Sequence, residues 1–162
     1  FALTSCSGEA PVEQVDTSGP PRSGGTLRVG LGVGDIAVGD EGLVLAADTR
    51  GNQLAVYTAL DVIRLHQTTP VPAGPWSVAW DSERDLAWVA STKHNLLTAF
   101  RISSGIPQRA AQLKTLADAQ SLVVTDDGTL VLASATGHGI QVITQPEVAQ
   151  PELSEQPEEN AQ

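Results

Sequence analysis

A pattern that returns every 43 residues constrains the fold of this chain more than any other feature. In each copy an acidic turn precedes a short apolar strand, a polar turn follows, and a second apolar strand closes the pattern. The first strands begin 43 residues apart, at Leu43, Leu86 and Thr129, and the second strands are Leu54–Tyr57, Leu97–Phe100 and Ile140–Ile143. Short strands repeated at one spacing indicate an all-β chain built from stacked copies of one unit.

Two further strands complete the unit. An apolar strand precedes each acidic turn, at residues 35–38, 77–80 and 121–124, and a fourth strand follows at 62–65 in the first copy and at 110–116 in the second. Four antiparallel strands in about 40–45 residues match the size of a β-propeller blade. We therefore predict a β-propeller-like domain over residues 26–144, with about three four-stranded blades. The third copy lacks a fourth strand, and we expect residues 26–31 to supply it.

The second copy carries a resemblance to a known family. It contains Val78-Ala79-Trp80-Asp81, then Leu86-Ala87-Trp88-Val89-Ala90-Ser91, then Asn95-Leu96-Leu97-Thr98-Ala99-Phe100. This order of strand, acidic turn, strand ending in small residues, Asn turn and strand ending in an aromatic resembles the YVTN/YncE-type propeller blade. The resemblance covers about residues 30–143 and implies the propeller fold, but many functions share that fold.

Three blades fall short of a closed ring. Open blade edges carry unpaired backbone groups that favour association. We therefore expect this partial propeller to be completed by dimerisation, giving a ring of about six blades, or to pack its open edge against a larger protein partner.

The amino-terminal residues resemble a bacterial lipobox. Leu3-Thr4-Ser5-Cys6 places Leu three positions before the only cysteine, with small residues between them. The resemblance implies that residues 1–5 end a lipoprotein signal peptide, that Cys6 receives a diacylglyceryl group, and that the protein is anchored on the extracytoplasmic side of the cell membrane. Residues 6–25 are rich in Gly, Ser and Pro, which predicts a flexible tether. The alternative is a buried or incidental cysteine.

The formal charge of −10 is concentrated at the other end of the chain. Residues 145–162 contain five glutamates and no basic residue, and Gln-Pro-Glu recurs three times. Closely spaced prolines forbid a helix, so we predict a disordered acidic tail. The chain has no basic stripe to neutralise phosphates, and this excludes nucleic acid as an expected partner.

Few residues suggest chemistry. His94 and His138 occupy the corresponding turn of successive copies and are weak metal candidates, but exposed turn histidines are the favoured interpretation because no third ligand has usable spacing. No catalytic arrangement is evident, and we expect no cofactor. The aromatic residues of the second copy are either packing between blades, which we favour, or interface residues. They are Trp76, Trp80, Trp88 and Phe100, of which Trp76 is the best candidate for the surface.

These observations predict a non-enzymatic lipoprotein that acts as a protein-binding scaffold or accessory subunit of an envelope complex, for example a respiratory one. The alternatives are a propeller enzyme of the lactonase or quinoprotein type and a protein that binds a small ligand or metal. Such enzymes cluster His, Asp, Glu or Asn around a central channel, and three blades with scattered histidines supply few of these.

Overall fold

The computed structural model describes residues 2–4, 11–16, 18–19, 22–28, 30–103 and 105–148. Nearly all regular structure in them is antiparallel β, with one short 3-10 turn, η1 (Asp40–Gly42). The strands are β1 (Ala2–Thr4), β2 (Pro11–Asp16), β3 (Arg22–Arg28), β4 (Val33–Val38), β5 (Leu43–Asp48), β6 (Gln53–Ala59), β7 (Ile63–Pro70), β8 (Pro75–Asp81), β9 (Leu86–Ser91), β10 (Leu96–Arg101), β11 (Gln108–Lys114), β12 (Ala119–Val124), β13 (Leu130–Ser134) and β14 (Ile140–Ile143). No helix in this described part is long and apolar enough to cross a membrane.

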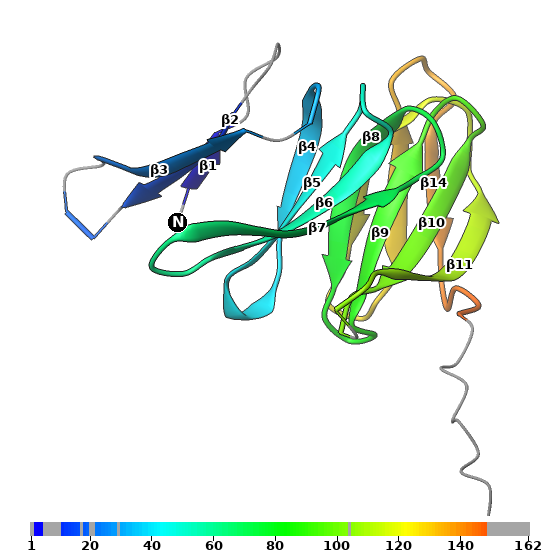
Figure 1. Ribbon diagram of the computed structural model, residues 1–162. Helices are drawn as coiled ribbons and strands as arrows, with labels where there is room; N and C mark the ends of the chain where they lie inside the picture. Colours follow the sequence, from blue (N-terminus) through cyan, green and yellow to red (C-terminus); the bar gives the residue numbers. More distant parts are fainter. Residues whose placement is uncertain are drawn as a thin grey trace, which may run out of the picture.

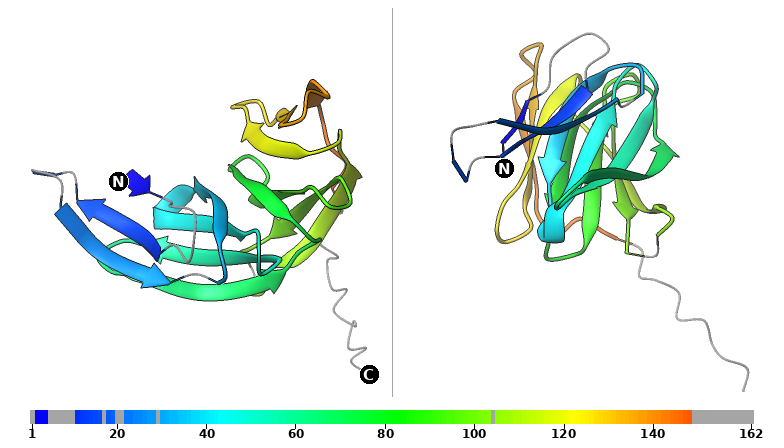
Figure 2. Two further views of the ribbon diagram at one scale, coloured as in Figure 1. Left: turned by 90° about the horizontal axis from the view of Figure 1, so that it is seen from above. Right: turned by 60° about the vertical axis from the view of Figure 1, so that its left-hand side comes forward.

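Four antiparallel sheets follow one another along the chain (Figure 1). We name them the N-terminal sheet (β1–β3), the first blade (β4–β7), the second blade (β8–β11) and the third blade (β12–β14). Within each sheet the strands are neighbours in chain order, and the first strands of the three blades, β4, β8 and β12, contact one another in turn. Seen from above, the sheets form an arc that does not close (Figure 2).

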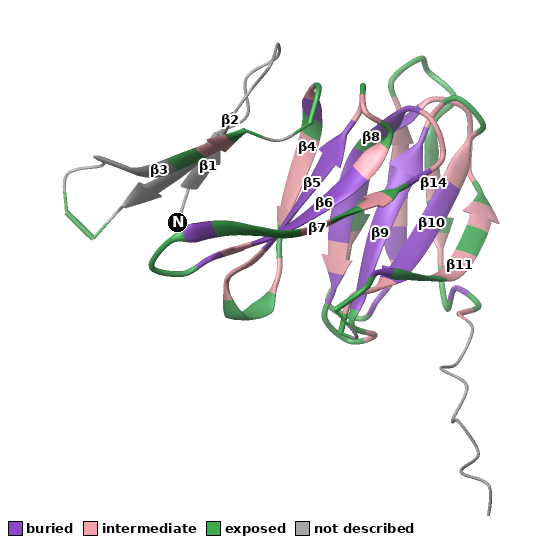
Figure 3. Ribbon diagram, in the orientation of Figure 1, coloured by how far each residue is buried: buried purple, intermediate pink, exposed green. Residues whose placement is uncertain are grey.

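The predicted all-β, β-propeller-like fold is therefore confirmed. The three predicted blades are present. The first two have four strands and the third has three, and a further three-stranded sheet precedes them. The strands lie where the repeat places them because alternate residues of each strand face the neighbouring blades, and both faces are apolar in the middle of the stack. β9 illustrates this, since all six of its residues are buried (Figure 3).

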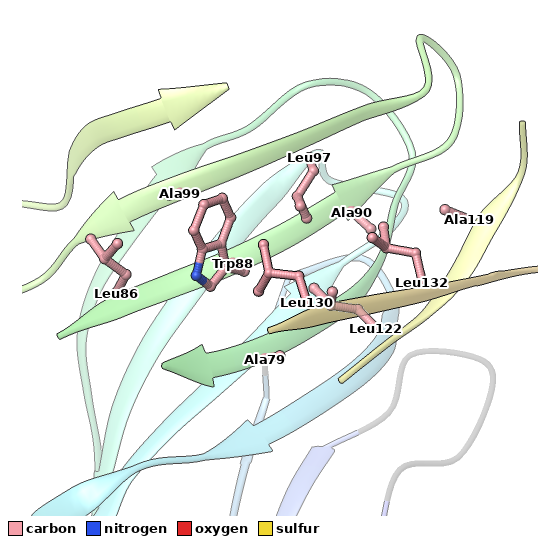
Figure 4. Packing of buried hydrophobic residues seen from close by; sticks show 10 residues of the cluster. All are labelled: Ala79, Leu86, Trp88, Ala90, Leu97, Ala99, Ala119, Leu122, Leu130 and Leu132. Atoms are coloured by element: carbon pink, nitrogen blue, oxygen red, sulfur yellow. The ribbon is translucent and has the colours of Figure 1, made fainter. Parts of the chain in front are cut away.

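Two clusters of buried side chains hold the three blades together. Between the first and second blades lie Leu45, Ala47, Leu54, Val56, Val78, Ala87, Val89 and Phe100, with Val71 at their edge. Between the second and third blades lie Ala79, Leu86, Trp88, Ala90, Leu97, Ala99, Ala119, Leu122, Leu130 and Leu132 (Figure 4). Each cluster takes residues from one face of each of two sheets, which is how packed sheets form a common core.

The asparagine of the repeated polar turn has a structural role. Asn52 and Asn95, at φ of 54° and 52°, both adopt the left-handed conformation that Asn tolerates better than most residues. The side-chain oxygen of Asn52 accepts a hydrogen bond from the amide of Gly74 (3.0 Å), and that of Asn95 accepts one from Asp118 (3.2 Å). In both repeats the turn thus binds the segment that leads into the next blade.

The N-terminal part differs from the sequence predictions. Residues 6–25 were expected to be a tether, yet their described part includes β2 and the start of β3, paired with each other. Main-chain hydrogen bonds between strands depend little on apolar composition, so the Gly- and Ser-rich sequence gave no sign of this pairing. Residues 26–31 also do not complete the third blade: β3 pairs with β2 at the opposite end of the arc (Figure 2).

The beginning of the acidic tail belongs to the fold. Pro146 is buried, and Val148 packs against the cluster between the second and third blades. The remainder of the predicted tail, from residue 149 onwards, lies outside the described residues, as does Cys6.

Candidate functional site: a groove between the first two blades

Two of the four aromatic candidates are core residues. Trp88 is fully buried among the residues between the second and third blades, and Phe100 is buried between the first and second. The Trp88 indole N–H donates a hydrogen bond to the buried carboxylate of Asp81 at 3.2 Å. Neither ring reaches the surface of the chain, so Trp88 and Phe100 contribute to the packing between blades that we favour for the aromatic residues, and not to an interface.

The other two aromatic candidates are accessible. Trp76, at the start of β8, is 38% exposed. Trp80, at the other end of the same strand, is half-buried, and its indole N–H donates a hydrogen bond to the carboxylate of Asp40 in η1 at 3.1 Å. This contact joins the first blade to the second, and it places Trp80 in the wall of a groove.

The groove lies between the first two blades, at the end where η1 is found. It consists of two adjoining cavities of about 390 Å³ and 280 Å³, which share Leu43, Ile102 and Ser103. The larger cavity is also lined by Val56, Thr58, His66, Gln67, Gly105 and Pro107, and the smaller by Asp40, Glu41, Trp80 and Asp85. Pockets of several hundred cubic ångströms between packed elements are where proteins commonly bind ligands.

The two halves of the groove differ in chemistry. In the larger half the hydroxyl of Thr58 and Nε2 of His66 lie 2.7 Å apart, and Gln67 and Ser103 are the other polar residues of a wall that is otherwise apolar. The smaller half brings three carboxylates beside the Trp80 indole, and none of the residues lining it is basic. A carboxylate-lined wall beside an aromatic face suits a cationic group attached to an apolar body. Thr58 and His66 are a hydroxyl beside an imidazole base, but the residues that line the larger half include no carboxylate that could orient the His66 ring.

The two histidine candidates lie in turns of different blades, His94 in the second and His138 in the third. His94 and His138 are both exposed in turns, and Nδ1 of His138 lies 3.2 Å from the Thr136 hydroxyl. Within the described residues, no group of three or more His, Cys, Asp or Glu side chains is arranged to hold a metal ion.

Sequence reasoning missed two buried carboxylates. Asp81 accepts hydrogen bonds from Trp88 and from both the amide and the guanidinium of Arg84, and Asp48 accepts four others. Both aspartates end an apolar strand, which is the one signal that could have found them. Their hydrogen bonds hold turns and connections in place, and neither lines the groove.

The repeated sheets define the class of this protein: an open, β-propeller-like repeat protein whose blades are not closed into a ring. Comparison with known protein families finds no match, and no curated protein matches the chain.

Solved structures resemble the fold at low sequence identity. A protein from Lactobacillus plantarum has a TM-score of 0.66 and 15% identity, over 89% of this chain and 53% of its own length. Hydrazine synthase from Kuenenia stuttgartiensis has a TM-score of 0.63 and 14% identity, over 70% of this chain and 32% of its own length. A functionally unknown protein from Desulfotomaculum acetoxidans has a TM-score of 0.56 and 12% identity, over 88% and 65%. This chain thus spans less than two thirds of each of these proteins, and at such identities the likeness concerns the fold alone.

Proposed function

We propose that this protein is a non-catalytic bacterial lipoprotein of YVTN/YncE type, held at the extracytoplasmic face of the cell membrane by a lipid on Cys6. Its blades bind protein, and the protein acts as an accessory or scaffold subunit of an envelope complex. The observation that carries the binding role is an uncovered apolar sheet face at the end of the arc. On the third blade, Val123, Ile140 and Val142 are each more than half exposed. Contiguous exposed apolar residues on a sheet are typical of surfaces that bind protein.

The groove supports the same role. Its apolar half and its carboxylate-lined half suit a side chain or short segment that combines apolar and cationic groups.

The proposal of lipid anchoring rests on Leu3-Thr4-Ser5-Cys6. Signal peptidase cleavage before Cys6 would remove β1 (Ala2–Thr4), which pairs with β2 over residues 13–15. The mature N-terminal sheet would then consist of β2 and β3, beginning five residues after the lipidated cysteine. The lipid would thus sit close to one end of the arc.

Replacing Cys6 with alanine tests the anchor. We expect Cys6→Ala, expressed from the natural gene in the protein's own cells, to lose all incorporation of radiolabelled palmitate and to leave the membrane fraction, because the thiol is the atom that the diacylglyceryl group modifies. Ser23→Ala, a change in the same N-terminal part of the chain, should be labelled like the wild type. Equal labelling of Cys6→Ala and Ser23→Ala would show that Cys6 carries no lipid.

A further inference from the structure

The uncovered face of the third blade is made of two rows of residues that run across its three strands. The strand register places Val123, Val131 and Val142 side by side in one row. The other row consists of Ser121, Ala133 and Ile140. We call these six residues the terminal face; none of them is charged. Ile140 is 72% exposed, Val142 59% and Val123 58%, whereas Val131 and Ala133 are half-buried.

The repeat identifies what covers such a face. Counting back by the repeat, the positions of Val131, Ala133, Ile140 and Val142 correspond to Leu45, Ala47, Leu54 and Val56 in the first blade, and to Trp88, Ala90, Leu97 and Ala99 in the second. All eight are buried, those of the first blade against the second and those of the second blade against the third. The third repeat keeps the apolar pattern, and no further sheet follows it in the described part of the chain (Figure 2).

The covering surface is therefore another sheet. In both internal cases the side chains that close the core come from an antiparallel sheet. Val78 and Val89 of the second blade cover the first blade, and Leu122 and Leu132 of the third blade cover the second. Sheets that pack face to face in this way interdigitate small and branched side chains at about 10 Å separation. Both internal faces of this kind are covered by a sheet, and we therefore expect a sheet on the terminal face as well.

A second copy of this chain can supply that sheet. The other large exposed apolar residues lie in turns, near strand ends or on the outer strand β7, and among described residues only the terminal face presents several of them on adjacent strands. The best match that a second copy offers to the terminal face is the terminal face itself. A surface that is neutral and made entirely of small or aliphatic side chains can pack against a copy of itself, which a twofold interface requires.

We propose that two copies of this protein associate through their terminal faces about a twofold axis, so that each third blade is covered by the third blade of the other copy. This inference rests on the proposed protein-binding function and names the partner and the residues. It differs from closure into a ring, in which the third blade of one copy would meet the N-terminal sheet of the other. Because each copy carries a charge of −10, added salt should strengthen the association by screening their repulsion.

Substitution of Val142 tests the proposal. We expect the wild-type chain to sediment as a dimer at micromolar concentration, and Val142→Glu to raise the dissociation constant at least about tenfold, because it places two like charges in a dry interface. The control is Val62→Glu, which makes the same change at a residue equally exposed (60%) in the β6–β7 turn, and it should dimerise like the wild type. Circular dichroism and thermal unfolding establish that both variants remain folded.

A crosslink distinguishes the arrangement of the two copies. With Cys6 changed to alanine, Val142→Cys should form a disulfide between copies under mild oxidation, whereas Val62→Cys should not.

A wild-type monomer over the whole concentration range, or a dimer that Val142→Glu leaves intact, would overturn the proposal. If Val142→Glu instead abolished binding of a different protein to a monomeric wild type, the terminal face would serve another partner. In that case the proposed binding function would stand while the proposed dimer would fail.

Discussion

Replacing Trp88 with alanine is expected to lower the free energy of unfolding by about 3–5 kcal/mol, which is the usual cost of removing a fully buried large aromatic side chain. Trp88 is 0% exposed and lies between the second and third blades (Figure 4). Its ring packs among residues from both sheets, so a cavity there cannot be closed without moving one blade against the other. The loss should appear in urea unfolding followed by circular dichroism.

Two further variants separate the contributions of the ring. Trp76→Ala, which removes a tryptophan that is 38% exposed on β8, should cost less than about 1 kcal/mol. Trp88→Phe keeps much of the volume but removes the N–H that donates to Asp81, and it should cost about 1–2 kcal/mol. If Trp88→Ala cost no more than Trp76→Ala, the packing between the second and third blades would not be the main core of the chain.

The destabilisation by Trp88→Ala should include more than the loss of packing, because Asp81, which accepts the Trp88 hydrogen bond, is linked through Arg84 to the third blade. Its carboxylate accepts hydrogen bonds from the amide and guanidinium of Arg84, and the same guanidinium nitrogen donates to the carbonyl of Gly128 in the third blade at 3.0 Å. Loss of Trp88 leaves one lone pair of a buried carboxylate without its donor, which adds to the cost of the cavity.

The repeat allowed the strands of the three blades to be predicted from sequence. The central strands of the blades are marked by runs of apolar residues and bounded by turn residues such as Asn52 and Asn95. These runs are continuous in the middle of the stack because both faces of a middle blade are buried. The strand order within each blade follows from the short turns. The repeat also predicts which side chains of each strand pack against the next blade. Ile140, for example, occupies the position of Leu54 and Leu97, which are buried in the first two blades.

Other features depend on contacts between residues far apart in the chain. The groove forms where Leu43 of the first blade meets Ile102 of the second, and no local pattern marks either residue as part of a groove. The hydrogen bond from Trp80 to Asp40 crosses between blades in the same way. The N-terminal sheet was missed for a different reason: its strands contain Gly, Ser and Pro, and pair mainly through the backbone.

The second large effect is expected at Asp48, the last residue of β5. This carboxylate is fully buried and accepts hydrogen bonds from the amides of Leu31, Gly32 and Gly51 at 2.9–3.1 Å, and from the side-chain amide of Gln53 at 2.9 Å. Burial acts to raise the pKa of Asp48, but these four hydrogen bonds outweigh it, and the net result is a pKa below the ordinary value of 3.8. The amides come from the connection that enters the first blade and from the β5–β6 turn, so Asp48 fixes both.

Asp48→Asn should therefore destabilise the protein by about 2–3 kcal/mol at neutral pH, because an amide NH2 replaces one acceptor oxygen and leaves buried N–H groups unpaired.

The pH dependence of this stabilisation has a definite sign. A folded-state pKa below the unfolded value means that the carboxylate stabilises the fold at pH above about 4, and that this contribution disappears as the pH falls through the lower pKa of the folded state. Urea unfolding of wild type and variant should thus differ at pH 7 and converge in acid. Asp61→Asn, at an exposed residue of the β6–β7 turn, should stay within about 0.5 kcal/mol of the wild type at pH 7. A gap between Asp48→Asn and wild type that persisted unchanged in acid would mean that the charge on Asp48 does not stabilise the fold.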